Sequence, residues 1–93
     1  MTDVYRALAD ATRRQILDLL VGRDGVTLFE ICSRLAESGT GSSRQAISQH
    51  LGVLEECGLI STEREGRTKL HWLDTAPLRE ITRRWPIDTR GTD

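Results

Sequence analysis

This 93-residue chain lacks most of the features that mark membrane, secreted or metal-binding proteins. No apolar run approaches the roughly 18 residues that a membrane-spanning helix needs. The first residues, MTDVYRALAD, lack the basic start and apolar stretch of a signal peptide. The two cysteines are 25 positions apart and form neither a CxxC pair nor a zinc-ligand cluster. We therefore expect a cytoplasmic chain in which Cys32 and Cys57 are buried, reduced thiols.

The chain also lacks an excess of positive charge. Its formal net charge is -1 and its isoelectric point is about 6.1, which counts against binding to nucleic acid. Residues 42–73 carry basic and acidic side chains in equal number: Arg44, Arg64, Arg67, Lys69, Glu55, Glu56, Glu63 and Glu65. Any contact with DNA must therefore depend on where the fold places these charges.

What the chain does contain predicts one small folded domain. Its hydrophobic content is 38% and it has only two prolines, which is typical of an ordered globular chain. We expect a single domain over residues 1–93, with an ordered core at 3–85 and a flexible tail at 86–93. A domain this short buries a modest share of its surface, so a second subunit is a natural source of stability. No paired carboxylates, nucleophile with a base, or cofactor-binding loop is evident, so we expect neither an enzyme nor a cofactor.

Apolar spacing and capping residues predict three helices in the first 38 residues. Asp3 and Asp10 are the expected N-caps of the first two, which end near Ala9 and at the glycines of residues 22–25. Thr27 and Glu30 have the spacing of a reciprocal capping box at the start of the third. The apolar faces of the three helices are Val4, Tyr5 and Leu8; Ile16, Leu17, Leu20 and Val21; and Leu28, Ile31 and Leu35.

A fourth helix is expected within residues 42–60, SSRQAISQHLGVLEECGLI, after a glycine- and serine-rich loop at 38–43. Ser42 and Gln45 match a second capping box, and the helix is expected to end at residues 57–58. Its apolar side is Ile47, Leu51 and Leu54, and its opposite side is Gln45, Ser48, Gln49 and Gly52. No acidic residue occurs between Glu37 and Glu55. A glycine inside a helix costs roughly 1 kcal/mol relative to alanine. Gly52 is therefore either a tolerated weak point of the helix or a place where another group closely approaches the helix backbone.

The segment after this helix predicts a β-hairpin followed by a last helix. Polarity alternates along the segment LISTEREGRTKLHWLD, where Leu70 and Trp72 alternate with Lys69 and His71. The expected turn is Glu65-Gly66. Two strands alone are marginal, so the hairpin should pack on the helices and take Val26 as a third strand. The last helix should start after residue 74 or 75, accept Pro77 in its first turn and stop at Pro86.

This order of elements is that of a winged helix-turn-helix: a mainly α fold of about five helices with a two- or three-stranded wing. In such a fold the second helix of the motif enters the major groove of DNA, whose base edges offer hydrogen-bond donors and acceptors. Short polar side chains suit that position because the helix backbone lies close to the bases.

Three segments resemble the ArsR family of bacterial winged-helix repressors: ALADATRRQILDLL, SRQAISQHLGVLEECGLI and REGRTKLHWLDTAPLREI. The resemblance covers residues 3–85 in order. It implies a homodimer on double-stranded DNA, with repression released by an inducer. By position, the implied base-reading residues are Ser43, Arg44, Gln45, Ser48 and Gln49, with His50 as a further contact. The implied wing contacts are Arg64, Arg67 and Lys69. The implied dimer interface, on the first and last helices, is Val4, Tyr5, Leu8, Leu78, Ile81 and Trp85.

Two departures limit this resemblance. Metal-sensing members carry a cysteine pair at positions that correspond here to Thr27 and Phe29, and the last helix offers only Glu80 as a ligand, so no metal site is expected. The turn LAESGTGSS is longer than the usual three or four residues of a helix-turn-helix, which either bulges into solvent or changes the angle of the reading helix.

Several alternatives follow from the residues alone. His50 either packs against the hairpin or contacts a phosphate or base. The whole chain is either a sequence-specific DNA-binding regulator or a winged-helix module that binds another protein. A thiol-based repressor is a third alternative, in which oxidation of Cys32 or Cys57 weakens DNA binding.

Overall fold

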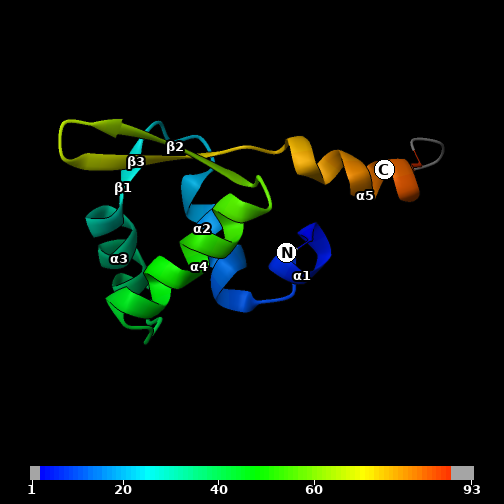
Figure 1. Ribbon diagram of the computed structural model, residues 1–93. Coiled ribbons are helices and arrows are strands. Elements are labelled where there is room, and N and C mark those ends of the chain that lie inside the picture. Colours follow the sequence, from blue (N-terminus) through cyan, green and yellow to red (C-terminus); the bar gives the residue numbers. More distant parts are fainter. Residues whose placement is uncertain (1–2, 89–93) are drawn as a thin grey trace.

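The computed structural model describes residues 3–88, and within them it confirms the predicted winged helix-turn-helix (Figure 1). The elements run in the order α1 (Val4–Leu8), α2 (Ala11–Leu20), β1 (Val26–Thr27), α3 (Leu28–Glu37), α4 (Arg44–Glu56), β2 (Ile60–Glu65), β3 (Thr68–Leu73), the 3-10 turn η1 (Ala76–Leu78) and α5 (Arg79–Arg84). Of the tail expected at 86–93, residues 86–88 are without regular structure and exposed, and the rest lies outside the described range.

Side-chain caps set the starts of the first four helices. Asp3, Asp10 and Thr27 each accept a hydrogen bond from the backbone N–H three residues later, as expected. The prediction of Ser42 as the cap of α4 was wrong by one residue. Ser43 is the cap, and its hydroxyl oxygen accepts from the N–H of Ala46 at 3.1 Å. Adjacent serines offer the same hydroxyl, so which one caps depends on how the preceding loop enters the helix.

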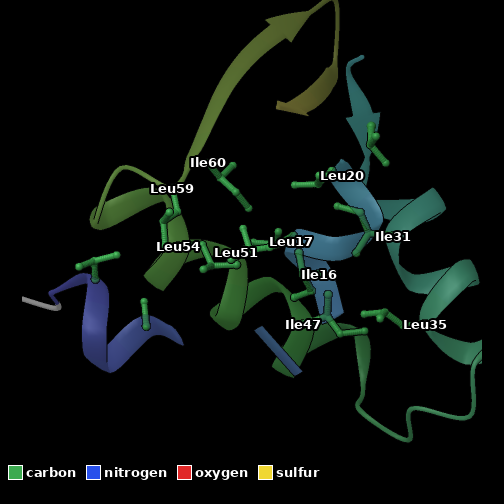
Figure 2. Close-up of a cluster of buried hydrophobic side chains, with 13 residues drawn as sticks. Ile16, Leu17, Leu20, Ile31, Leu35, Ile47, Leu51, Leu54, Leu59 and Ile60 are labelled. Carbon is green, nitrogen blue, oxygen red and sulfur yellow. The ribbon is translucent and has the colours of Figure 1, made fainter. Parts of the chain in front are cut away.

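The core lies between α2, α3 and α4 and is closed by the first residues of the sheet (Figure 2). Ile16, Ile31 and Leu54 are fully buried, one from each of these helices. The predicted apolar side of α4 is confirmed, because Ile47 and Leu51 are buried with Leu54. Burying a side chain of this kind stabilises the fold by about 1.5–3 kcal/mol. The core therefore fixes which side of α4 is left for solvent.

The three strands form one antiparallel sheet in the order β1-β3-β2, so Val26 does supply the third strand. Glu65 pairs with Thr68, which leaves Gly66 and Arg67 as the two-residue turn. The predicted turn, Glu65-Gly66, was one residue early. Gly66 has a φ of +63°, which glycine adopts without the steric cost of a side chain.

The inward side of β3 also differs from the alternation expected from the sequence. His71 is buried at 4% exposure, whereas Leu70 and Trp72 are only half-buried. The Nδ1–H of His71 donates to the carbonyl oxygen of Val26 at 2.7 Å, which satisfies the buried ring nitrogen and ties β3 to β1. A polar residue can take a core position when it has such a partner, and the sequence pattern does not reveal that partner.

The loop at 38–43 is largely exposed, but it is tied to the body of the fold at Thr40. The N–H of Thr40 donates to the carbonyl of Leu35 at 2.9 Å, and its hydroxyl donates to Oε1 of Gln15 at 2.8 Å. The second contact joins the loop to α2, which also packs against α4. The long turn is thus fixed at its middle.

The C-terminal segment is split into the turn η1 and the helix α5, where one helix was expected. Pro77 lies within η1, and α5 ends at Arg84, with Trp85 as its C-cap directly before Pro86. In Figure 1 this segment extends away from the sheet and lies beyond α1, at the end of the molecule opposite the hairpin tip. Within residues 3–88, no helix combines the length and apolar character needed to cross a membrane.

Candidate nucleic-acid interface

The first two turns of α4 form an exposed polar surface. Arg44, Gln45, Ser48 and Gln49 are all exposed, while Ile47 anchors the helix from below. The side chain of Arg44 has no hydrogen bond or ion pair within residues 3–88, so its guanidinium is available to a ligand. Ser43 is exposed but uses its hydroxyl oxygen as the cap of the helix, which leaves only the hydroxyl proton for another molecule.

The wing separates its basic and acidic side chains onto opposite faces. Arg64 lies directly across from Lys69 in the sheet register, and cross-strand partners share a face. Glu63 and Glu65 lie on the other face, because successive residues of a strand alternate. Arg67 lies in the turn at the tip and has no partner within the described residues. The equal numbers of charges in this segment therefore do not cancel in space.

Glu55, near the end of α4, joins this helix to the wing. Its carboxylate accepts from the hydroxyl of Thr62 on β2 at 2.8 Å and from Nζ of Lys69 on β3 at 3.2 Å. The hydrogen bond from Thr62 and the ammonium of Lys69 hold the pKa of Glu55 below its ordinary value, against the opposing effect of desolvation. The contact also shows that the face bearing Thr62, Arg64 and Lys69 is the one turned toward α4.

Two adjoining grooves run between α4 and the wing. The outer groove has a volume of about 330 Å³ and is lined by Thr27, Leu28, Phe29, Arg44, Arg67, Thr68 and Lys69. The inner groove, of about 140 Å³, is lined by Leu28, Ser48, Leu51, Gly52, Glu55, Lys69 and His71. The fold thus brings four of the predicted DNA contacts onto one surface: Arg44, Ser48, Arg67 and Lys69. Gln45 and Gln49 are exposed on α4 outside these grooves.

His50 lies away from this surface, against α2. Its Nδ1 is 3.2 Å from NH1 of Arg13, so the ring contacts the helix body instead of the hairpin. The same guanidinium donates from Nε to the carbonyl of Ala7 at 2.9 Å and from NH2 to that of Arg6 at 3.1 Å. Arg13 therefore connects the C-terminal end of α1 with α4.

The cap of α2 is part of this cluster. The backbone N–H of Arg13 bonded to the Asp10 carboxylate lowers the pKa of Asp10, and the charges of His50 and Arg13 lower it further, against desolvation. A carboxylate that stays ionised stabilises the positive end of the helix dipole at this helix start.

The residues expected at a dimer interface have different environments. Val4 is buried at 4% exposure in the core of its own chain and has little surface to offer a partner. Tyr5, Leu8, Leu78 and Ile81 are partly buried against that core. Trp85 is 59% exposed and meets Tyr5 edge to face, with ring centroids 6.1 Å apart and an interplanar angle of 85°. The guanidinium of Arg84 lies 4.7 Å from the ring centroid of Trp85 and 5.6 Å from that of Tyr5.

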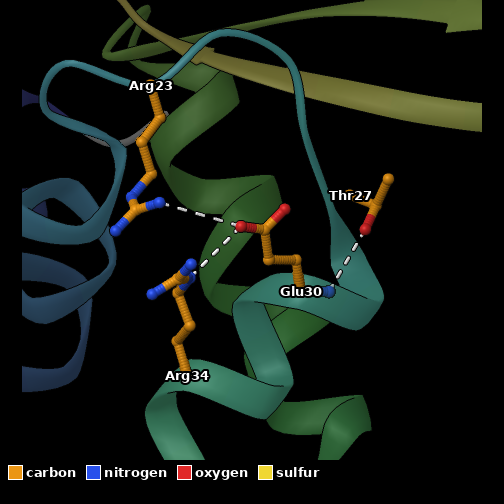
Figure 3. A network of polar contacts seen from close by, with 4 residues as sticks. All are labelled: Arg23, Thr27, Glu30 and Arg34. Atoms are coloured by element: carbon orange, nitrogen blue, oxygen red, sulfur yellow. Dashed lines mark hydrogen bonds and ion pairs between the residues drawn. The ribbon is translucent and has the colours of Figure 1, made fainter.

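The start of α3, around Thr27 and Glu30, holds an ion-pair network (Figure 3). Thr27 caps the helix, but the other half of the predicted capping box does not form. The Glu30 carboxylate instead contacts Nε of Arg34 at 3.1 Å and NH1 of Arg23 at 3.8 Å. No group of three or more potential metal ligands lies together in residues 3–88. Cys32 and Cys57 are free and only half-buried, where fuller burial was expected.

Three residues that hold α4 or the sheet in place were missed in the sequence: Arg13, Glu55 and His71. Each acts through a partner at least seven positions away in the chain, so helical or strand periodicity carries no signal for it. Glu55 offered one indirect clue, because it ends the acid-free stretch of α4 directly before the wing. The other two could not be distinguished from ordinary polar residues.

Comparison with known proteins gives consistent matches over this region. A family model described as a helix-turn-helix domain matches residues 8–63. The HTH-type transcriptional regulator YuzN of Bacillus subtilis is 39% identical over 83 residues, which cover 88% of this chain and 90% of YuzN. The transcriptional repressor SdpR of the same organism is 36% identical over 80 residues, covering 86% of this chain and 82% of SdpR.

Solved structures give the same result. A possible transcriptional regulator for arsenical resistance superposes with a TM-score of 0.75 at 33% identity, covering 95% of this chain and 88% of its own. An ArsR-like transcriptional regulator from Rhodococcus sp. RHA1 has a TM-score of 0.74 at 36% identity, covering 87% of this chain and 69% of its own.

Proposed function

Because this chain belongs to the ArsR family of winged helix-turn-helix transcriptional regulators, we propose that it acts as a homodimeric repressor on an inverted-repeat operator. The observation that carries the proposal is the surface shared by α4 and the wing. Exposed, unpaired Arg44 on the helix and Arg67 on the wing border one groove, and the acids of the wing lie on its other face. This arrangement supplies the local positive charge that the overall composition lacks.

In the proposed complex, α4 enters the major groove and the wing lies on the flanking backbone. Arg44, Gln45, Ser48 and Gln49 supply the donors and acceptors that base edges require, and Ser43 donates its free hydroxyl proton. Arg64, Arg67 and Lys69 contact phosphates. His50 is directed toward Arg13 and acts by holding α4 in place, so we assign it no base contact.

A two-fold dimer sets the spacing of the operator. Two α4 helices must reach successive turns of the major groove on one side of the duplex, so the half-sites lie about 34 Å apart or a multiple of that distance. The proposed interface consists of Tyr5, Leu8, Leu78, Ile81 and Trp85. Repression is the direction favoured by the likeness to SdpR, and a regulator of this kind acts in the cytoplasm, where it requires no cofactor to bind DNA.

The test is an anisotropy titration with duplex DNA from the region upstream of the chain's own gene. We expect the wild-type protein to prefer this duplex over a scrambled one and to lose affinity steeply as salt increases. The double variant Arg44→Ala with Gln49→Ala should remove most of the preference, since one good bidentate base contact is worth about 1–3 kcal/mol. Arg83→Ala, an exposed arginine on α5, serves as the charge-matched control.

The competing assignment is a winged-helix module that binds a protein partner. It predicts that the double variant and the control bind DNA alike, with weak affinity that ignores sequence. That outcome would reject the proposed regulator function.

A further inference from the structure

Phe29 is the most exposed aromatic residue in the described chain, at 71%. It lies in the first turn of α3, off the stripe formed by Leu28, Ile31 and Leu35 that packs into the core. Single exposed apolar residues are common on protein surfaces and need no explanation by themselves. Phe29 differs because of the charges around it.

Phe29 borders the outer groove, where three elements meet. Arg44 comes from the start of α4, Arg67 from the wing turn and Lys69 from β3, and no carboxylate lines this groove. Phe29 also borders a second groove, which is lined by Glu30 and Glu37 together with Arg34. The charges therefore favour an anionic occupant in the outer groove over the second one.

The groove also lies where a duplex would have to pass. If α4 occupies the major groove and the wing tip reaches the flanking backbone, one strand must cross the space between them. That space is the outer groove. A sugar-phosphate backbone offers phosphates for the guanidiniums and the apolar face of a deoxyribose ring for an aromatic side chain.

We propose that this groove holds the backbone of the strand that crosses between α4 and the wing, with Phe29 packed against its deoxyribose rings. The inference rests on the proposed DNA-binding function and adds to it an uncharged contact that the sequence did not suggest. The phosphates on either side of this sugar lie between Arg44 and Arg67. Because Phe29 touches sugar rather than base, it contributes affinity without sequence preference.

The experiment compares two kinds of loss in one titration series. Phe29→Ala should lower affinity for the upstream duplex and for a scrambled duplex by the same factor, roughly ten-fold. The slope of log affinity against log salt should not change, because no phosphate contact is lost. Arg67→Ala should lower affinity and also reduce that slope by about 1. Phe29→Leu, which keeps an apolar side chain, should recover most of the loss.

Val21→Ala is the matched control. Val21 was expected in the buried stripe of α2, but it is the C-cap of that helix and is 63% exposed. It borders none of the grooves described above. Thermal unfolding should show that neither alanine variant alters stability, since both side chains are outside the core.

If Phe29→Ala keeps wild-type affinity while Arg67→Ala binds more weakly, the duplex contacts the wing but not Phe29. This result would overturn the inference and leave the proposed function standing. Failure of the wild-type protein to bind any duplex would reject the proposed function as well. Equal competition by polyglutamate of the same charge would indicate an acidic polypeptide as the occupant and also overturn the inference.

Discussion

Gly52 is the residue at which folding and binding can be separated most directly. It lies inside α4, and a methyl group built on it would meet no atom of the described residues within 4 Å, apart from its chain neighbours and the backbone of its own helix. We expect Gly52→Ala to raise the free energy of unfolding by about 1 kcal/mol, because alanine is the better helix former. For a chain of this size that corresponds to a rise in melting temperature of about 4–8 °C. Thermal unfolding monitored by circular dichroism measures it.

The same variant decides between the two explanations of the glycine. If the DNA affinity of Gly52→Ala is unchanged, Gly52 is a tolerated weak point of the helix with no role in binding. If affinity falls while stability rises, the bare backbone is needed for close approach of the duplex, next to Ser48 in the inner groove. A fall in stability would contradict the open surroundings of this residue.

At the scale of single residues, the sequence predicts exposure better than partners. The polar side of α4 follows from periodicity, and Arg44, Ser48 and Gln49 are exposed as expected. The burial of His71 does not follow, because it depends on a carbonyl 45 positions away in the chain. The position of His50 depends in the same way on Arg13, 37 positions away.

Among the elements, the joint between α4 and the wing is sensitive to acid. The pKa of Glu55 is lowered in the folded state, chiefly by the hydroxyl of Thr62 and then by Lys69. A lowered folded-state pKa means that the contact stabilises the protein above the ordinary glutamate pKa of about 4.3 and that this contribution is lost as pH falls through the folded value. We expect Glu55→Gln to lower the free energy of unfolding at pH 7 by about 0.5–1 kcal/mol, as for other exposed pairs. The difference from wild type should shrink toward zero near pH 3.

Urea unfolding across this pH range measures the effect. Glu56→Gln is the control, since Glu56 is the adjacent carboxylate on α4 and has no partner within the described residues. The difference in unfolding free energy between Glu56→Gln and wild type should not follow the pH dependence expected for Glu55→Gln, because Glu56 does not hold the wing. Identical pH profiles for the two variants would show that Glu55 does not hold the wing.

The elements themselves were largely predictable because their signals are local. The first three helices each begin at a side-chain cap visible in the sequence. α4 ends at Glu56, two residues before Gly58, whose φ is +88°. The exact hairpin turn was not predictable, because its register is fixed by the pairing of Ile60 with Leu73 at the far end of the strands. The division between η1 and α5 was missed because Pro77 is compatible with the start of either kind of helix.

At the scale of the whole molecule, apolar side chains at the C-terminal end remain uncovered. Trp85 and Ile87 are 59% and 73% exposed, and they lie on the segment that extends beyond α1 (Figure 1). The Trp85 ring meets Tyr5 edge to face, and the guanidinium of Arg84 lies 4.7 Å from its centroid. An exposed indole with such neighbours is the kind of residue that dominates the energy of protein interfaces. We therefore expect a second copy of the chain to cover this end.

Trp85→Ala should convert the proposed dimer to a monomer at micromolar concentration, measured by sedimentation velocity. Affinity for a two-half-site operator should then fall by roughly 100-fold, because the second α4 is no longer held at a high effective concentration. Affinity for a single half-site should not change, since the start of α4 and the tip of the wing lie away from α5 (Figure 1). Phe29→Ala removes another exposed aromatic, at the start of α3 and away from α5, and should leave the dimer intact. A Trp85→Ala protein that sediments as a dimer would locate the interface elsewhere, because no other described aromatic is exposed on α1 or α5.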